Sequence, residues 1–205
     1  MLDGIMRKQL DPMLNAWGVK LYGRGFRANH ITLAGLALGL TAAGMIAAGA
    51  NFGLALIPLL LGRIADGLDG AVARAGQKTD FGGYLDIVCD FIFYGAIPLA
   101  FAIRDPANAV AAAFLLTSFY VNGASFLAFA IFAEKLGLAQ DSASKVRGEK
   151  SLYFTAGLAE GSETIAFFVA ICLWPGLFVP LAYGFAVLCL ATAAARIALA
   201  RRHFP

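Results

Sequence analysis

Long apolar runs occupy most of the chain, and clusters of glycine, proline and charged residues separate each run from the next. A helix needs about 20 mostly apolar residues to cross a bilayer. Divided at those clusters, the pattern predicts six membrane-spanning helices, at about 31-49, 52-74, 81-103, 107-133, 152-174 and 177-199. We therefore expect an all-α, polytopic integral membrane protein whose residues 29-205 form one transmembrane domain.

The segment 1-28 has a different pattern. Leu10, Met13, Leu14 and Trp17 recur at helical spacing, and charged residues lie between the apolar positions. This spacing predicts an amphipathic juxtamembrane helix that lies in the membrane interface, with a polar segment of no regular structure as the alternative. The charges also exclude a secretory signal peptide, which needs an uninterrupted apolar core.

The basic residues predict the orientation. If the six helices alternate in direction, the 16 lysines and arginines fall on one side except Arg63, inside a span, and Arg104, on the opposite side. Because basic loops face the cytoplasm, we expect both termini to be cytoplasmic. The turns on the opposite side are too short to hold a site.

The composition narrows the class of protein. Hydrophobic residues make up 60% of the chain and charged residues 14%, whereas soluble proteins average about 25% charged. The net charge of +3, with no clustered basic face, excludes nucleic acid as a partner. The three cysteines lie in apolar runs without paired spacing, which is typical of buried apolar residues and not of disulfides or zinc ligands. With only two histidines, we do not expect catalysis through histidine.

Carboxylates inside a bilayer are costly and usually mark function. Three predicted spans carry them in pairs: Asp66 and Asp69, Asp86 and Asp90, and Glu160 and Glu163. Measured from helix ends near 74 and 151, Asp66 and Glu160 lie about 12 to 14 Å deep at 1.5 Å per residue. Asn122 and Ser125 of the fourth span lie at a similar level. Polar groups from four helices at one depth predict a water-filled cup open to the cytoplasm.

The spacing of the four aspartates indicates a metal site. Asp66 and Asp69 are three residues apart and Asp86 and Asp90 four apart, so each pair projects from one helical face. Converging carboxylates in a low-dielectric site repel one another unless a cation neutralises them. Oxygen-only ligation favours Mg2+ or Mn2+, and such ions typically bridge phosphate oxygens. The alternative is that the pairs neutralise nearby bases such as Arg63 and Arg74.

Two further features of this segment have open interpretations. Gly67 and Gly70 are poor helix formers, and they either let a ligand approach the backbone or allow close packing of helices. Arg74 has the bidentate geometry suited to a phosphate, but an arginine at a cytoplasmic boundary also serves as a topology determinant.

The segment from Asp66 to Asp90 resembles the signature of the CDP-alcohol phosphotransferase (CDP-alcohol phosphatidyltransferase) family, D-x2-D-G-x2-A-R-x8-G-x3-D-x3-D. Every fixed residue of that signature is present. The one departure is a shorter spacer, residues 75-81, in place of the usual eight residues before Gly82. The run Asn29-His30-Ile31-Thr32 is similar to the motif with which the family contacts its donor.

The resemblance implies an activity and a set of residue roles. The family transfers a substituted phosphate from a CDP-linked donor to an alcohol with release of CMP, as a homodimer with two divalent ions. Asp66, Asp69 and Asp86 would be metal ligands, and Asp90 would be both ligand and general base. The implied contacts to the CDP moiety are Asn29, Thr32, Gly70, Ala73, Arg74 and Thr79. The chain shows no nucleophilic serine or cysteine motif, which favours direct displacement over a covalent intermediate.

The acceptor is less clearly marked than the donor. Lipid-exposed helices can accept acyl chains laterally, which favours CDP-diacylglycerol as the donor and a small polar alcohol as the acceptor. The reverse assignment, CDP-choline or CDP-ethanolamine with a lipid alcohol, uses the same motif and stays open. Glu160, Glu163, Asn122 and Ser125 are the candidate acceptor contacts, since the acids can accept hydrogen bonds from a polyol or attract an amine.

Two other classes remain as alternatives. A membrane prenyltransferase also combines aspartate pairs with Mg2+, but it needs more helices than this length provides. A cation transporter could use buried carboxylates as an ion path, but it would be expected to show an internal repeat. We therefore favour a phospholipid-synthesising enzyme of a bacterial cytoplasmic (inner) membrane, with its active site open to the cytoplasm.

Overall fold

The computed structural model describes residues 2–137 and 161–204, with side chains from Asp11 onward, and the regular structure of these residues is helical throughout. The helices are α1 (Leu2–Gly23), α2 (Ala28–Ala47), α3 (Phe52–Ala75), α4 (Asp80–Arg104), α5 (Ala109–Lys135), α8 (Gly161–Leu173) and α9 (Phe178–His203). Single 3-10 turns, Pro106–Asn108 and Pro175–Leu177, precede α5 and α9. The all-α prediction is confirmed for this part of the chain.

Within the described residues, four helices are long and apolar enough to cross a membrane: α2, α4, and α5 and α9 with the turns that precede them. The chain is therefore an integral membrane protein. Helix α3 spans 24 residues but contains Arg63, Asp66, Asp69 and Arg74, and α8 is an apolar helix of 13 residues. Residues 152–160 of the predicted fifth span lie outside the described residues. Six spans and cytoplasmic termini stay predictions.

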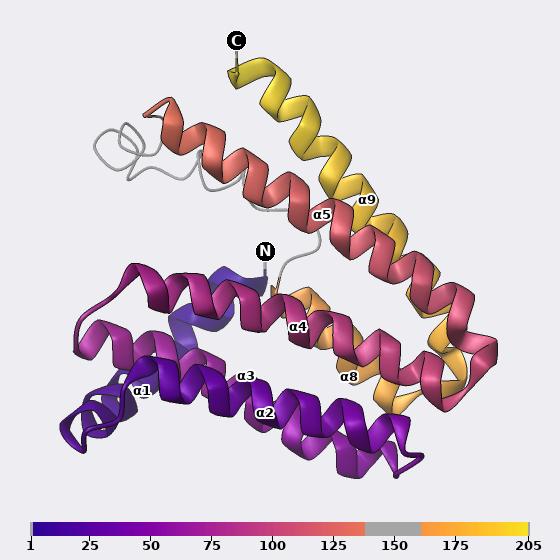
Figure 1. Cartoon of the computed structure of the whole chain (residues 1–205), viewed down its shortest axis with the longest axis horizontal. Helices are drawn as coiled ribbons and strands as arrows, with labels where there is room; N and C mark the ends of the chain where they lie inside the picture. Colours follow the sequence, from indigo (N-terminus) through magenta and orange to yellow (C-terminus); the bar gives the residue numbers. More distant parts are fainter. Residues whose placement is uncertain (1, 138–160, 205) are drawn as a thin grey trace.

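The helices form two groups that meet at one end of the molecule. Figure 1 shows α2, α3 and α4 together, α5 and α9 side by side, and the ends of both groups approaching each other at the turns before α3, α5 and α9. In the first group, α2 and α3 approach closely at Gly35 and Gly62, where a Cβ on Gly62 would lie 2.9 Å from the Gly35 carbonyl oxygen. Small residues at this crossing allow backbone contact between membrane helices.

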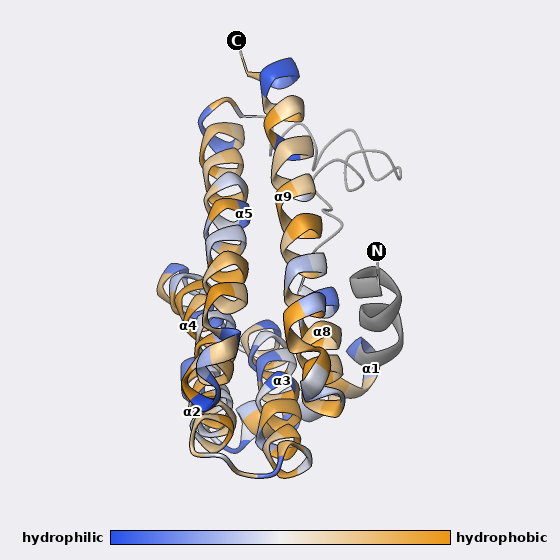
Figure 2. Cartoon of the chain, turned by 90° about the vertical axis from the view of Figure 1, so that its right-hand side faces the viewer, coloured by the Kyte–Doolittle hydropathy of each residue, from blue (hydrophilic) through white to orange (hydrophobic). Residues whose placement is uncertain are grey.

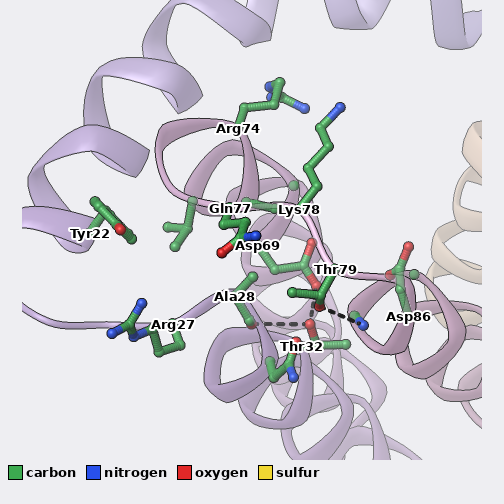
Figure 3. A pocket seen from close by; sticks show the side chains of 16 residues that line it. Tyr22, Arg27, Ala28, Thr32, Asp69, Arg74, Gln77, Lys78, Thr79 and Asp86 are labelled. Atoms are coloured by element: carbon green, nitrogen blue, oxygen red, sulfur yellow. Dashed lines mark hydrogen bonds between the residues drawn. The ribbon is translucent and has the colours of Figure 1, made fainter.

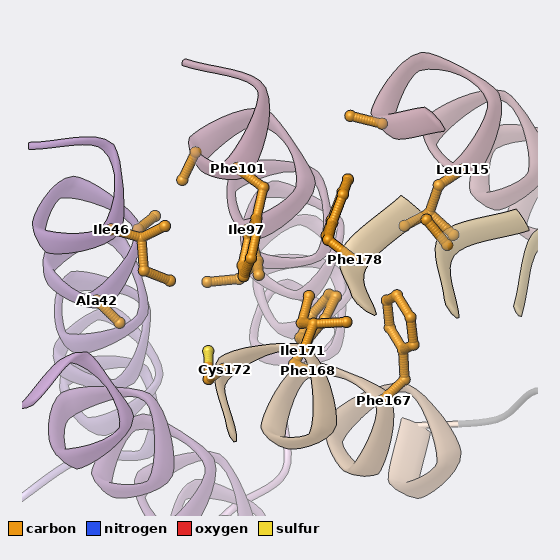
Figure 4. Close-up of a cluster of buried hydrophobic side chains, with 14 of the residues drawn as sticks. Ala42, Ile46, Ile97, Phe101, Leu115, Phe167, Phe168, Ile171, Cys172 and Phe178 are labelled. Carbon is orange, nitrogen blue, oxygen red and sulfur yellow. The ribbon is translucent and has the colours of Figure 1, made fainter. Parts of the chain in front are cut away.

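An aromatic core joins the two groups near those turns (Figure 4). Phe101 of α4 stacks on Phe178 of α9 with ring centroids 4.5 Å apart, and Phe93 of α4 meets Phe168 of α8 edge to face at 5.6 Å. All four rings are fully buried. Offset and edge-to-face pairs stabilise such a core beyond the area they bury. The apolar core thus fills one half of the bundle and leaves the polar helix ends to the other half.

The predicted N-terminal helix is present as α1, which crosses α3. Gly18 lies against the backbone of Ala71, and Leu14 lies against Gly67. Met13 and Trp17 remain 55% exposed. Gly25, with φ of 89°, makes the turn between α1 and α2, a conformation that favours glycine. The location of α1 in the membrane interface stays a prediction.

The outer surface agrees with a lipid environment. Figure 2 shows hydrophobic residues along most of α5 and α9, with hydrophilic residues at the C-terminal end of α9. Arg201, Arg202 and His203 lie in the last turn of that helix. Cationic side chains near a helix C-terminus interact favourably with the helix dipole.

Candidate active site

A cavity of about 470 Å³ opens where the last turns of α3, the first turns of α2 and α4, and the end of α1 meet. Figure 3 shows Tyr22 and Arg27 on the side of α1, Asp86 on the opposite side, and Thr32 and Asp69 between them. The lining residues come from two stretches of the chain, 22–32 and 69–86, that are distant from each other in sequence. Helix packing therefore builds this site at the polar end of the α2, α3 and α4 group.

Three of the four predicted metal ligands lie together. Each of Asp66, Asp69 and Asp86 contributes one carboxylate oxygen to a group in which all the atoms lie within 4.8 Å of one another. Asp66 and Asp69 share a face of α3, and α4 brings Asp86 to them. Two helices thus supply a set of hard oxygen ligands at one point.

Thr32 orients one of these carboxylates. Its Oγ1 donates a hydrogen bond of 2.6 Å to Asp69 Oδ2 and lies 3.1 Å from the carbonyl oxygen of Ala28. Thr32 and Asp69 are each 6% exposed. Hydrogen bonds that involve an ionised group are shorter and stronger than neutral ones. The first turn of α2 therefore fixes the Asp69 carboxylate on α3.

Asp90 has a different partner from the other aspartates. Its Oδ1 accepts a hydrogen bond of 2.9 Å from Nη1 of Arg63, and the same nitrogen lies 3.5 Å from Oδ1 of Asp66. Both interpretations of the aspartates thus find support, and Asp66 takes part in both arrangements. Asp66, Asp69 and Asp86 converge, whereas Asp90 makes the shortest contact with Arg63.

The residues predicted to contact the CDP moiety line one cavity. They are Asn29, Thr32, Gly70, Ala73, Arg74 and Thr79. Thr79 is the N-cap of α4, where its Oγ1 accepts a hydrogen bond of 3.0 Å from the amide of Gly82. Asn29 lies beside the same glycine. The first turns of α2 and α4 therefore face each other across the cavity.

The two glycines of the motif have different neighbours. Gly67 packs against Leu14 of α1, with 3.2 Å between a Cβ built there and the leucine Cδ1, which fits the packing interpretation. Gly70 lines the cavity, and the atom nearest to its Cβ position is Nη1 of Arg74 at 3.4 Å. Gly70 thus leaves backbone accessible to a ligand.

Arg74 connects the cavity with α1. Its Nε and Nη2 donate hydrogen bonds of 3.0 and 2.9 Å to Oδ1 of Asn15, and Nη2 lies 3.8 Å from Oδ1 of Asp11. The arginine is partly exposed. Its guanidinium can therefore exchange these partners for a phosphate without leaving a buried charge.

The candidate acceptor contacts on α5 bind an arginine of α9. Nη1 of Arg196 donates to the backbone and side-chain oxygens of Asn122, at 3.1 and 3.0 Å, and to Oγ of Ser125, at 2.7 Å. Arg196 is 7% exposed. Glu163 lies in the first turn of α8 and accepts a hydrogen bond of 3.1 Å from Ser162. Glu160 lies outside the described residues.

Comparison with known proteins identifies the family. The family model for CDP-alcohol phosphatidyltransferase matches residues 26–199. The chain belongs to the CDP-alcohol phosphatidyltransferase family. The resemblance drawn from the signature is thereby confirmed. The protein is a transferase of phospholipid biosynthesis.

A curated relative and a solved structure are similar over most of their length. The chain is 40% identical over 198 residues to the inner membrane protein YnjF of Escherichia coli. This match covers 96% of this chain and 94% of YnjF. The crystal structure of phosphatidylinositol phosphate synthase of Mycobacterium tuberculosis with CDP-DAG bound is 23% identical, with a TM-score of 0.62. The match covers 91% of this chain and 90% of the synthase. This chain and the mycobacterial synthase thus share the CDP-alcohol phosphatidyltransferase fold.

The donor set of this CDP-alcohol phosphatidyltransferase fits the divalent metal on which the family generally depends. The three clustered carboxylates offer only oxygen atoms, and these lie within 4.8 Å of one another. Hard divalent cations prefer oxygen ligands, and a cation would offset the repulsion among the carboxylates. The cluster can therefore bind a metal ion.

Four cavity residues with polar side chains were not among the predicted site residues of this CDP-alcohol phosphatidyltransferase: Tyr22, Arg27, Gln77 and Lys78. From the sequence, Arg27 and Lys78 were interpreted as determinants of membrane orientation, because basic residues commonly flank membrane helices on the cytoplasmic side. The guanidinium of Arg27 lies 5.8 Å from the ring centroid of Tyr22, and Tyr22 packs against Gly76. The sequence offered one signal for these four residues, which is their position: Tyr22 and Arg27 precede Asn29, and Gln77 and Lys78 lie between Arg74 and Thr79.

Proposed function

We propose that this protein transfers a phosphatidyl group from CDP-diacylglycerol to the hydroxyl of a small polar alcohol and releases CMP. The observation that carries the proposal is one cavity in which the six implied CDP contacts lie with Asp69 and Asp86. The family assignment supports the reaction class. The CDP-DAG bound to the mycobacterial synthase supports the donor, and the apolar outer helices give its acyl chains a lipid environment.

Asp66, Asp69, Asp86 and Asp90 would hold Mg2+ or Mn2+, and we propose two ions. Bound cations would offset the charge of the two donor phosphates and of the leaving CMP. Arg74 is suited to hold a phosphate through its planar fork, with Asn29, Gly70 and Thr79 on the facing helix ends. These contacts orient the donor for in-line attack.

Asp90 is the proposed general base. Its carboxylate accepts the proton of the acceptor hydroxyl while the hydroxyl oxygen attacks the phosphorus that bears diacylglycerol. The new bond joins this phosphorus to the acceptor oxygen, and the bond that breaks joins it to the oxygen that leaves with CMP. The absence of a nucleophile motif in the sequence favours this single displacement.

The acceptor side is proposed from α5, α8 and α9. Asn122 and Ser125 would contribute through the Arg196 network, and Glu163 with Glu160 would accept hydrogen bonds from a polyol or attract an amine. Acidic groups disfavour direct contact with an acceptor phosphate. We therefore propose an unphosphorylated alcohol as the acceptor.

We also propose a homodimer in a bacterial inner membrane with its cavity open to the cytoplasm. The inner-membrane relative YnjF supports the location. The basic residues that flank the cavity, among them Arg27, Arg74 and Lys78, support the orientation because basic segments face the cytoplasm.

The test uses the purified chain in lipid nanodiscs with Mn2+. We expect CMP release from labelled CDP-diacylglycerol with at least one member of a panel of small alcohols and loss of that release after chelation with EDTA. Added Mn2+ or Mg2+ restores it. Turnover of CDP-ethanolamine or CDP-choline with diacylglycerol, and none of CDP-diacylglycerol, would reverse the donor assignment. Ion flux in proteoliposomes without CMP release would support a transporter instead.

A further inference from the structure

Arg63 is a cation in the middle of α3, one turn before Asp66. Its side chain is 13% exposed. A buried charge is strongly destabilising unless it is paired, and Arg63 is paired with Asp90 at 2.9 Å and Asp66 at 3.5 Å. The chain therefore keeps a positive charge beside the carboxylates where the metal ligands are proposed.

The orientation of Arg63 is determined by packing as well as by charge. Its guanidinium carbon lies 4.2 Å from the ring centroid of Phe93, which is fully buried. Phe93 occupies space beside Gly39, where a Cβ would lie 2.5 Å from Cδ2 of the ring. Helix α2 thus packs against the Phe93 ring of α4, and that ring in turn packs against the guanidinium.

One nitrogen of the Arg63 guanidinium makes no hydrogen bond to a described residue. Nε of Arg63 is buried without a hydrogen-bond partner among the described residues. An unpaired buried donor costs about 1 to 3 kcal/mol. The Arg63 side chain keeps its contacts with Asp90 and Phe93 despite that cost. These two contacts therefore determine its orientation.

We propose that Arg63 is a positioning residue for Asp90: it holds Oδ1 of the carboxylate against α3 and competes with a divalent cation for the aspartates. Arg63 thereby orients Asp90, which is the proposed base as well as a proposed metal ligand. The catalytic part of this role rests on the proposed function. Its effect on metal binding does not depend on the reaction.

The test compares Arg63→Met and Arg63→Lys with the wild-type chain in nanodiscs. Mn2+ binding is measured by electron paramagnetic resonance, and folding by the melting temperature. We expect Arg63→Met to bind Mn2+ about tenfold more tightly, because a charge within a few ångströms of the carboxylates is removed. Arg63→Lys keeps the charge, so its Mn2+ affinity stays within about threefold of wild type.

The rates give the second readout. With Arg63→Met we expect kcat for CMP release to fall about a hundredfold while KM for the CDP donor changes less than about threefold, because a misplaced base affects the chemical step. Arg63→Lys restores part of the rate but not all of it, since an ammonium lacks the planar fork. In an Asp90→Asn background, the further loss on Arg63→Met falls below about threefold.

Arg104 provides the matched control. Its guanidinium lies 4.0 Å from the ring centroid of Phe52 and donates a 2.6 Å hydrogen bond to the carbonyl of Ala50, at the other end of the bundle. Arg104→Met removes the same kind of stacked arginine without touching a carboxylate. Its Mn2+ affinity should equal that of the wild-type chain.

Several outcomes would overturn the inference. Unchanged or weaker Mn2+ binding in Arg63→Met would show that Arg63 does not compete with the cation. If that variant does not fold, Mn2+ binding by Arg63→Lys more than about threefold tighter than wild type would show that charge is not the cause. A wild-type chain that releases no CMP from any CDP donor would overturn the proposed function alone, since the Mn2+ titration still tests Arg63.

Discussion

At the scale of residues, the aspartates of one motif have unequal surroundings. Asp66, Asp69 and Asp86 share a cluster, whereas Asp90 makes the shortest contact with Arg63, at 2.9 Å. Identical side chains thus have different chemistry available to them, because a clustered carboxylate attracts a cation and a paired one is held in place. The roles of ligand and base follow from this difference in the proposed mechanism.

Asp90→Asn tests the base directly. We expect kcat for CMP release to fall at least about a thousandfold, because the amide cannot accept the hydroxyl proton. Binding of the CDP donor, measured by equilibrium titration, should change less than about threefold. Asp80→Asn, at the exposed start of α4, is the control and should behave as wild type. Parallel loss of donor affinity and rate would indicate that Asp90 is mainly a metal ligand.

Thr32→Val tests the support of the cluster. It removes the 2.6 Å hydrogen bond to Asp69, and loss of a partner that orients a metal ligand typically costs about 10- to 100-fold in affinity. We expect Mn2+ affinity to fall by that factor in a direct titration. Thr41→Val on the same helix removes only a bond to the Ala37 carbonyl and should leave Mn2+ affinity unchanged. Equal affinities for both variants would contradict the assignment.

At the scale of elements, α1 is part of the site. Asn15 binds Arg74, and Gly18 lies against Ala71, so the helix packs beside the last turns of α3. An amphipathic helix could instead have lain on the membrane apart from the bundle. Its docking depends on small residues that let two backbones approach each other.

Gly18→Ala tests that docking. The added Cβ would lie 2.7 Å from the backbone carbon of Ala71, and overpacking of this kind costs about 1 to 3 kcal/mol. For a chain of this size we expect a fall of roughly 2 to 12 °C in Tm, measured by thermal unfolding in detergent. Gly23→Ala, on the same helix with open space around it, should leave Tm unchanged. A stable Gly18→Ala protein would mean that α1 is loosely attached.

At the scale of the whole molecule, the bundle separates an apolar half from a polar half. The aromatic core lies near the short turns, and the cavity lies at the opposite ends of α2, α3 and α4. In the proposed reaction, a polar site at one end of a membrane bundle exchanges a water-soluble acceptor and CMP on that side alone. The orientation of the molecule therefore determines which compartment supplies the acceptor.

Cysteine labelling tests this orientation. The native cysteines are buried, so single cysteines added at exposed positions dominate labelling by a membrane-impermeant maleimide. In intact cells stripped of their outer membrane we expect labelling of Ala107→Cys, in the short turn before α5. Arg24→Cys, between α1 and α2, should react only after permeabilisation. The opposite pattern would place the cavity outside the cytoplasm.

The sequence was informative wherever a property is local. Hydropathy predicted the apolar helices, and the spacing of Asp66, Asp69, Asp86 and Asp90 indicated which residues share a helical face. The same pattern overlooked Tyr22, Arg27, Gln77 and Lys78, because lining a cavity is not a periodic property. It also treated Arg196 as a flanking base, although that arginine is buried against α5.

The sequence by itself determined the class of protein, the family and the residues of the motif, because helical period and fixed spacing act within one segment. The tertiary structure decided the partners. Arg63 and Asp90 are 27 residues apart, Asn15 and Arg74 are 59 apart, and Asn122 and Arg196 are 74 apart. Such contacts depend on which helices cross and how closely, and this is determined by packing of small and aromatic residues between helices. A pattern along one helix shows the face that a side chain occupies, but only the neighbouring helix determines what that side chain meets.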